Sequence, residues 1–234
     1  MSQLTLLTVP PPALPDGIDL RCCSVEDLLA NVDGLPTLIV ADPPWSYEND
    51  HRLLGGVAGQ QYETTNNDRI AIVLAAAHRV ANKNCRLAMW GTWPKIQEWT
   101  VSTSQMGDNW PWRFVTGGAW TKLGGPGVGF HWFGNSEFVL VYTTGTPTTK
   151  RDVITLNAHS SFRQRHSEKP WKWMAGWIER WTEPGDLVLD LYAGMAPVAR
   201  ACVATGRRYL GAELDPVRHR QAVDRLALFR RDHE

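Results

Sequence analysis

The sequence predicts an α/β fold, in which an open, mostly parallel and twisted sheet carries helices on both faces. From Ile18 onward, short apolar runs typical of buried strands alternate with segments whose apolar residues recur every three or four positions. Such alternation favours a parallel sheet, because each helix returns the chain to the start of the next strand. Three predicted strands also run into an acid, and ligands bind beyond the carboxyl ends of strands in such sheets.

The first half of the chain supplies alternating strands and helices. After a strand from Ile18, the apolar run 37–41 predicts a buried strand. Asn67 or Asp68 can cap the helix that follows, whose apolar positions have helical spacing. Those positions are Ile70, Val73, Leu74, Ala77 and Val80. A strand is expected over 85–90, and then a helix capped by Thr92 with Pro94 in its first turn.

The second half resumes the alternation after a middle part of different character. Strands are expected over 113–120 and 137–143. Pro170 begins a helix that carries Trp171, Met174, Ile178 and Trp181 at helical spacing. The remaining predicted elements are a strand over 187–190, a helix over 196–205, a strand over 209–213 and a helix from 216 to about 229.

The chain is expected to form one domain. Residues 1–17 hold four of the fifteen prolines and predict an extended, loosely held lead-in. Residues 18–234 form the single domain, whose length suits one hydrophobic core. Glycine clusters and polar stretches predict mobile loops at about 48–66, 117–135 and 144–168.

Composition excludes several classes of protein. Basic and acidic residues both number 24, so the chain lacks the strongly basic composition that marks a nucleic-acid binder by charge alone, although a local basic patch stays open. No apolar run reaches membrane-spanning length, and the N-terminus is a poor secretory signal. The four cysteines form no C-x-x-C pair, which argues against a structural zinc site. We therefore expect buried free thiols, no metal, no membrane and a cytoplasmic location.

An unusual combination of groups follows the strand at 37–41. It is the run Asp42-Pro43-Pro44-Trp45. The prolines restrict the backbone and remove two donors, which leaves their carbonyl groups free to accept hydrogen bonds. The carboxylate and a carbonyl can each accept one hydrogen of an amino group, and the tryptophan can stack on a flat base. The alternative is a strand end closed by a Pro-Pro turn, with Trp45 in the core.

A second candidate site lies where the strand at 187–190 ends. Asp190 is followed by a turn containing Gly194, and Glu213 ends the next strand, 23 residues after Asp190. A glycine there lets the backbone approach a nucleotide, and an acid at that distance can hold ribose hydroxyls. The run is not G-x-G-x-x-G, which disfavours a pyrophosphate ligand and hence a nucleotide-binding oxidoreductase. A glycine that serves only helix–strand packing is the alternative.

These motifs together resemble the S-adenosylmethionine-dependent adenine-N6 methyltransferases of the Asp-Pro-Pro-Trp family, the beta-class enzymes similar to mRNA adenosine methyltransferase, in their bacterial or phage DNA-modifying branch. The likeness spans roughly residues 18–225, with the catalytic motif before the cofactor motif. It includes the runs 135–141, 166–170, 177–180, 184–190 and 206–213. The resemblance implies a Rossmann-like methyltransferase fold. The chain departs from the family at Ala196, where a second glycine is usual and where the added methyl is expected near the cofactor.

The resemblance also implies a role for each site residue. Asp42 and the Pro43 carbonyl would hold the adenine amino group, with Pro44 and Trp45 completing the catalytic motif and Trp45 stacking on the base. S-adenosyl-L-methionine would be bound by Cys22, Cys23, Ser24, Asp42, Lys169, Asp190, Tyr192, Ala193, Gly194 and Glu213. In this set Glu213 would hold the ribose, Lys169 the methionine carboxylate, and Cys22 to Ser24 the adenine.

DNA is the expected partner. Its contacts are expected at Tyr47, Lys122, His131, Lys150, Arg151, Arg163, Arg165 and His166, with Tyr62, Trp120 and Trp132 also able to close over the base. A second copy of the chain could supply sequence selectivity as a homodimer. Three alternatives stay open: methylation of RNA adenine at N6, methylation of DNA cytosine at N4, and a non-catalytic nucleic-acid-binding partner with the same fold.

If Arg163 and Arg165 contact phosphates, changing both to alanine will weaken DNA binding and flatten its dependence on salt, because fewer counterions are released. The measurement is a DNA binding titration at several salt concentrations. An unchanged slope would reject the assignment.

Overall fold

The computed structural model describes residues 12–45, 65–123, 136–146, 158–161 and 169–231. Within these residues, eight strands form one sheet in the order β1-β8-β7-β2-β3-β5-β4-β6. The strands are β1 (Ile18–Arg21), β2 (Leu38–Ala41), β3 (Arg86–Gly91), β4 (Arg113–Leu123), β5 (Ser136–Thr143), β6 (Ala158–Ser161), β7 (Leu187–Asp190) and β8 (Arg208–Ala212).

The sheet is mostly parallel, as predicted. Strands β1, β8, β7, β2 and β3 all run in one direction. Strand β5 runs antiparallel to both β3 and β4, and β6 is parallel to β4. Consequently the amino end of β5 lies at the same edge of the sheet as the carboxyl ends of β2 and β3, where Phe138 pairs with Gly91.

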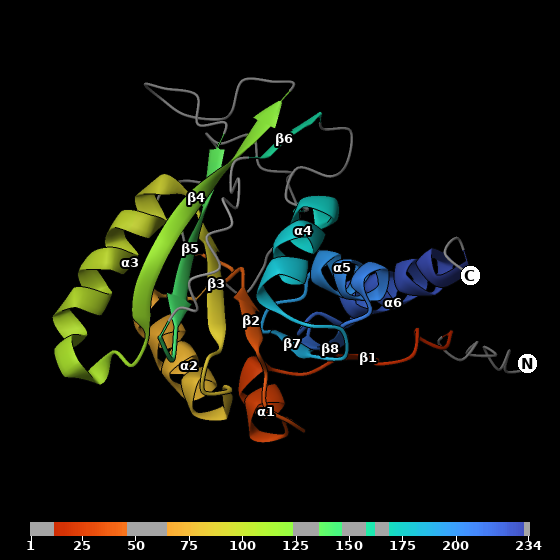
Figure 1. Cartoon of the computed structure of the whole chain (residues 1–234), viewed down its shortest axis with the longest axis horizontal. Coiled ribbons are helices and arrows are strands. Elements are labelled where there is room, and N and C mark those ends of the chain that lie inside the picture. Colours follow the sequence, from red (N-terminus) through yellow and green to blue (C-terminus); the bar gives the residue numbers. More distant parts are fainter. Residues whose placement is uncertain (1–11, 46–64, 124–135, 147–157, 162–168, 232–234) are drawn as a thin grey trace, which may run out of the picture.

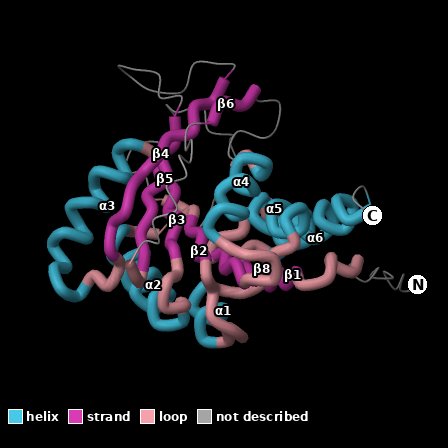
Figure 2. The backbone as a smooth tube through the Cα atoms, viewed as in Figure 1, coloured by secondary structure: helices cyan, strands magenta, loops and turns pink. Residues whose placement is uncertain are grey.

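Helices cover both faces of the sheet, which confirms the predicted layers (Figure 1). The helices are α1 (Val25–Ala30), α2 (Asn67–Val80), α3 (Trp93–Met106), α4 (Trp171–Trp181), α5 (Pro197–Thr205) and α6 (Pro216–Arg231), with a short 3-10 turn at Gly107–Asn109. Side chains of α1, α2 and α3 join one buried cluster, and those of α4, α5 and α6 join the other. Figure 2 shows the strands between these two groups of helices.

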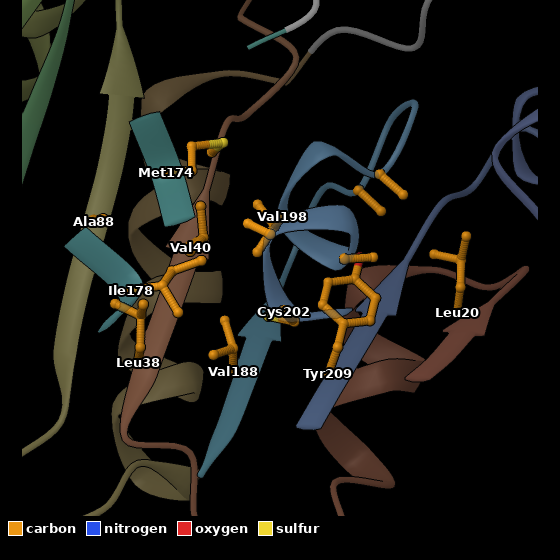
Figure 3. Packing of buried hydrophobic residues seen from close by; sticks show 14 of the residues in the cluster. Leu20, Leu38, Val40, Ala88, Met174, Ile178, Val188, Val198, Cys202 and Tyr209 are labelled. Carbon is orange, nitrogen blue, oxygen red and sulfur yellow. The ribbon is translucent and has the colours of Figure 1, made fainter. Parts of the chain in front are cut away.

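Alternation along the central strands divides their side chains between the two clusters. In β2, Leu38 and Val40 face α4 and α5, whereas Ile39 and Ala41 face the cluster of α1 to α3. Figure 3 shows Leu38, Val40, Val188 and Tyr209 of the sheet beside Met174, Ile178 and Val198 of α4 and α5. Each fully buried aliphatic side chain contributes about 1.5–3 kcal/mol relative to its exposed state, so burial on two faces stabilises the central strands most.

The helix starts differ slightly from their predicted positions. Asn66, rather than Asn67 or Asp68, caps α2, and its side chain accepts a hydrogen bond from the Arg69 backbone N–H. Thr92 precedes α3 as expected, but its side chain makes no capping hydrogen bond there. Pro94 lies in the first turn, where a missing N–H costs nothing because that group has no helical partner.

Two of the predicted loops contain regular structure. Gly117 and Gly118 belong to β4, where they pair with Leu140 and Val139, so the loop expected over 117–135 was wrong at its start. A Cβ atom at Gly117 would lie 3.3 Å from both the Leu140 side chain and the Val139 carbonyl oxygen, so close strand packing explains the glycine. The loop expected over 144–168 contains β6. Residues 46–64, 124–135, 147–157 and 162–168 lie outside the described residues.

The described end of the lead-in is more firmly held than expected. Pro15 is buried, its carbonyl oxygen accepts a hydrogen bond from Ile18 N–H, and Leu14 packs against the core.

Two of the four expected buried thiols are buried, Cys85 and Cys202, whereas Cys22 is exposed and Cys23 half-buried. Cys22 and Cys23 follow the end of β1, where the chain leaves the sheet. All four cysteines are free.

Ala196 has an unusual backbone conformation at the start of α5. Its φ of 55° and ψ of 48° are left-handed, and among the described residues it is the one non-glycine with a positive φ. The conformation costs alanine about 1–2 kcal/mol. The turn requires it, because Ala196 N–H donates to the Ala193 carbonyl at 2.7 Å while its own carbonyl accepts from Arg200 in α5. The side chain is fully buried in the cluster of α4 to α6, and a methyl near the cofactor stays a prediction.

Replacing Ala196 with glycine should change the free energy of unfolding by less than about 1 kcal/mol. Relief of about 1–2 kcal/mol of strain is offset by about 0.4–1 kcal/mol of unfolded-state entropy and about 0.8 kcal/mol for the lost methyl. Ala196→Val should instead destabilise by more than about 2 kcal/mol, because a β-branched side chain resists the left-handed conformation and overfills the site. Urea unfolding measures both. A valine variant as stable as the parent would contradict the conformation.

Candidate active site

Three acids predicted to share a site lie at one edge of the sheet. Asp42 follows β2, Asp190 ends β7 and Glu213 follows β8. They meet because β8, β7 and β2 are parallel neighbours whose carboxyl ends point the same way. The charges of Asp42 and Glu213 both contribute to the raised pKa of Asp190, so the three carboxylates form one electrostatic group.

Asp190 is the most deeply buried of the three, with 1% of its surface exposed. Burial raises its pKa to about 7, although hydrogen bonds from the Tyr209 hydroxyl and the Tyr192 backbone N–H act in the opposite direction. The Tyr209 hydroxyl donates to Oδ2 at 3.1 Å. The carboxyl group of Asp190 therefore changes its charge near neutral pH.

The turn after β7 is tied directly to Glu213. Gly194 N–H donates to Glu213 Oε2 at 2.8 Å, and Asp215 N–H donates to Oε1 at 2.9 Å. Ala193 N–H donates to the Ala212 carbonyl at 2.8 Å, which joins the turn to β8. Gly194 has a φ of +54°, and a Cβ atom there would meet nothing within 4 Å, so its backbone is accessible to a ligand.

The other cofactor candidates lie around this turn and after β1. Tyr192 is half-buried against the cluster of α1 to α3, and burial raises its pKa. Ser24 caps α1: its hydroxyl accepts from Asp27 N–H at 3.1 Å and donates to the Asp27 carboxylate at 2.7 Å. Burial, followed by the charge of Asp27, raises the pKa of Cys23. Cys23 also lines a hollow of about 430 Å³ with Arg21, Asp27, Asn31 and Asp33.

The two proline carbonyls were expected to be free to accept hydrogen bonds, and each accepts one from a backbone amide of the chain. The Pro43 carbonyl accepts a hydrogen bond from Trp45 N–H at 2.9 Å. The Pro44 carbonyl accepts from Thr65 N–H at 2.9 Å, which ties the turn to the segment before α2. The prolines lack backbone N–H donors, but the backbone amides of Trp45 and Thr65 donate hydrogen bonds to their carbonyl groups. These bonds hold the turn rigidly beyond Asp42.

Trp45 lies in the core, contrary to the stacking role expected for it. Its side chain is 7% exposed, its Nε1 donates to the Trp90 carbonyl at 3.1 Å, and its ring meets Trp99 edge-on at 6.4 Å. Gly91 leaves room for this ring, since a Cβ there would lie 3.3 Å from it. Trp120 is fully buried as well, so it cannot close over a base either.

Lys169 makes contacts that the sequence did not indicate. Its Nζ lies 2.6 Å from Asp42 Oδ2 and 3.0 Å from Glu137 Oε2, and 5.3 Å above the Trp90 ring. Burial lowers the pKa of Lys169, but the two carboxylates outweigh burial and raise it. Glu137 was not predicted as a site residue. Its place in an antiparallel strand brings it to this edge, and its spacing in the sequence carries no such signal.

Most predicted nucleic-acid contacts lie outside the described residues. These are Tyr47, His131, Lys150, Arg151, Arg163, Arg165 and His166, together with Tyr62 and Trp132. The backbone of Lys122 lies in β4 and pairs with Ser160 of β6.

No described helix is long and apolar enough to cross a membrane. The described residues contain no group of three or more histidine, cysteine or acidic side chains able to hold a metal ion.

Known proteins resemble this chain in sequence. The family model N6_N4_Mtase, described as DNA methylase, matches residues 146–224, which include the turn after β7 and Glu213. An Escherichia coli K12 protein whose name describes it as a methylase, YubD, is 26% identical over 201 residues, or 82% of each chain.

Solved structures show the fold. The M1.HpyAVI–SAM complex aligns with a TM-score of 0.67 at 16% identity, over 89% of this chain and 98% of that one. TTHA0409 of Thermus thermophilus, described as a DNA modification methylase complexed with S-adenosyl-L-methionine, aligns with a TM-score of 0.64 at 19% identity, over 90% and 93%. The PvuII cytosine-N4-specific DNA methyltransferase aligns with a TM-score of 0.63 at 14% identity, over 94% and 88%. The chain has the Rossmann-like methyltransferase fold, and the family match supports a DNA methylase.

Asp190→Asn should stabilise the protein at pH 8, because the native state holds this carboxyl with a raised pKa. A raised pKa means that stability is greatest below the unfolded value of 3.8 and falls as the pH rises toward 7. The gain at pH 8 should be on the order of 3 kcal/mol, and asparagine can still accept the hydrogen bond from Tyr209. Urea unfolding at pH 4.5 and pH 8 measures it. An equal effect of the substitution at both pH values would contradict the raised pKa.

Proposed function

We propose that this protein transfers a methyl group from S-adenosylmethionine to the N6 amino group of adenine in DNA. The observation that carries the proposal is the carboxylate of Asp42, 34% exposed at the same edge as the Asp190 turn and Glu213. A donor site and an acceptor carboxylate side by side suit a direct transfer between two ligands. The family match over 146–224 and the solved relatives with bound S-adenosylmethionine support this chemistry.

The residues around the turn fit the cofactor chemically. The cofactor supplies an electrophilic methyl group on a sulfonium. Glu213 offers carboxylate oxygens to ribose hydroxyls from a position set by Gly194, whose surroundings are open. The Lys169 ammonium suits the methionine carboxylate, and ionised Asp190 suits a cationic group nearby. Cys22, Cys23 and Ser24, which follow β1, are proposed beside the adenine, together with Tyr192 and Ala193 of the turn.

Asp42 would orient the target rather than act as a strong base. The adenine amino nitrogen is a poor nucleophile, since its lone pair is delocalised into the ring. Asp42 accepts one amino hydrogen, and the second lone pair of the Pro43 carbonyl accepts the other, because only one is used by Trp45 N–H. The nitrogen then becomes pyramidal and directs its lone pair at the methyl group. After the methyl transfer the nitrogen is cationic, and it loses a proton to Asp42 or to water.

We propose adenine rather than cytosine as the target base, because Asp42 and Trp45 flank the two prolines as they do in the adenine-modifying family that the chain resembles. Methylation of cytosine N4 is the alternative that a structural relative favours, since the PvuII enzyme of that specificity has the same fold. RNA as the polymer and a non-catalytic binding partner are further alternatives. Phosphate contacts at the basic residues outside the described ranges, a cytoplasmic location and a homodimer belong to the same proposal.

Nucleoside mass spectrometry tests the reaction directly. Unmethylated duplex DNA, single-stranded DNA and RNA are each incubated with S-adenosylmethionine and the protein. We expect N6-methyldeoxyadenosine, and we expect Asp42→Ala and Asp42→Asn to lower its rate by at least about 10²-fold, since the amino group loses its orientation. Asp224→Asn is the matched control, because it removes an exposed carboxylate paired with Arg220 in α6.

Each other outcome selects an alternative. N4-methylcytosine would replace the adenine assignment, and a ribonucleoside product would replace DNA with RNA. No methylated base on any polymer would contradict the proposal and favour a non-catalytic partner. Calorimetry with S-adenosylmethionine then separates a protein that still binds the cofactor from one that does not.

A further inference from the structure

The ammonium of Lys169 is shared by two carboxylates that come from different strands. Asp42 follows β2 and Glu137 lies in β5, and β3 separates these strands in the sheet. The Lys169 side chain spans this distance above the Trp90 ring, with its Nζ 2.6 Å from Asp42 and 3.0 Å from Glu137. One cation thus bridges the proposed acceptor carboxylate and a second acid with no role assigned to it.

The burial of Lys169 and Glu137 makes the sharing of the ammonium important for stability. The side chains of Lys169 and Glu137 are 8% and 12% exposed, whereas Asp42 is 34% exposed. A buried ammonium needs at least one carboxylate partner, because an unpaired charge in a weakly polar environment is strongly destabilising. Trp90 provides an aromatic face below the cation, which attracts it but does not neutralise it.

The same contact interferes with the proposed role of Asp42. While Lys169 holds Oδ2, part of the negative charge that would attract an amino hydrogen is neutralised. Asp42 can engage the target fully only if Lys169 moves toward another partner. Glu137 already lies within ion-pair distance, so the ammonium can shift to it without becoming unpaired.

We propose that Glu137 is a positioning residue that holds Lys169 when Asp42 engages the target amino group, so that Asp42 and Glu137 alternate as its principal partner. This inference rests on the proposed function for its catalytic consequence, but the alternation itself is a property of the free protein. Without Glu137, Asp42 still holds Lys169, so the ammonium stays near Asp42 even when the proposed methionine carboxylate also approaches it. The target amino group is then poorly oriented, even though the cofactor and DNA still bind.

Thermal unfolding tests the alternation without any methyl transfer. Asp42→Asn and Glu137→Gln should each lower the melting temperature only slightly, because the other carboxylate still pairs with Lys169. The double variant should lose more than the sum of the two, and adding Lys169→Met to it should recover stability by removing the unpaired charge. Glu98→Gln is the matched control, since Glu98 also pairs with a buried lysine, Lys95, at 2.6 Å. Additive losses in the double variant would overturn the proposal.

Kinetics test the consequence. Glu137→Gln should lower kcat by about 10²-fold through a misplaced target group, with little change in KM for DNA or in the dissociation constant of S-adenosylhomocysteine measured by calorimetry. Glu137→Asp should recover most of the activity, because it retains the carboxylate. A normal kcat in Glu137→Gln, or a loss of cofactor affinity equal to the loss of kcat, would overturn the positioning role. If the wild-type protein methylates no polymer, the proposed function is contradicted instead. The thermal unfolding of the variants then tests by itself whether Asp42 and Glu137 alternate as partners of Lys169.

Discussion

The parallel pairing of β2, β7 and β8 is the constraint on which the candidate site depends. Each strand is short and buried, and each is followed or ended by an acid at the same edge. Hydrogen bonds between neighbouring parallel strands set their register, with Val40 opposite Asp190 and Asp190 opposite Gly211. A shift of one residue in this register would turn the apolar side chains of a strand to the wrong faces, so burial on both faces also fixes where the acids lie.

The buried tryptophans stabilise the structure around this edge of the sheet. Of the tryptophans that the structure describes, six are buried: Trp45, Trp90, Trp99, Trp112, Trp120 and Trp177. Edge-on contacts link Trp90 to Trp120 and Trp173, and Trp99 to Trp45 and Trp110. Such contacts add about 0.5–1.5 kcal/mol each beyond burial. They hold the turn beyond Asp42 and the floor below Lys169 in place, so the charged groups lie on a rigid support.

The charges themselves oppose stability. Asp190 is buried with a pKa raised to about 7, and Lys169 is buried between two carboxylates. Buried ion pairs are costly to desolvate and contribute little net stability, so packing alone does not account for them. Four carboxylates and one ammonium at the edge suit a ligand that carries both an amino group and a carboxylate, as the proposed cofactor does.

The sequence by itself determined the fold class, the strands that carry the acids and the turn at Gly194, because these depend on local apolar patterns and on glycine and proline. It also correctly placed Asp42, Asp190 and Glu213 at one edge, since parallel strands align their carboxyl ends. Tertiary structure decided the rest. The burial of Trp45 depends on Gly91 and that of Trp120 on its contact with Trp90, and the place of Glu137 depends on β5 running antiparallel, which brings its amino end to that edge. Contacts between segments so distant in the chain leave no periodicity in the sequence.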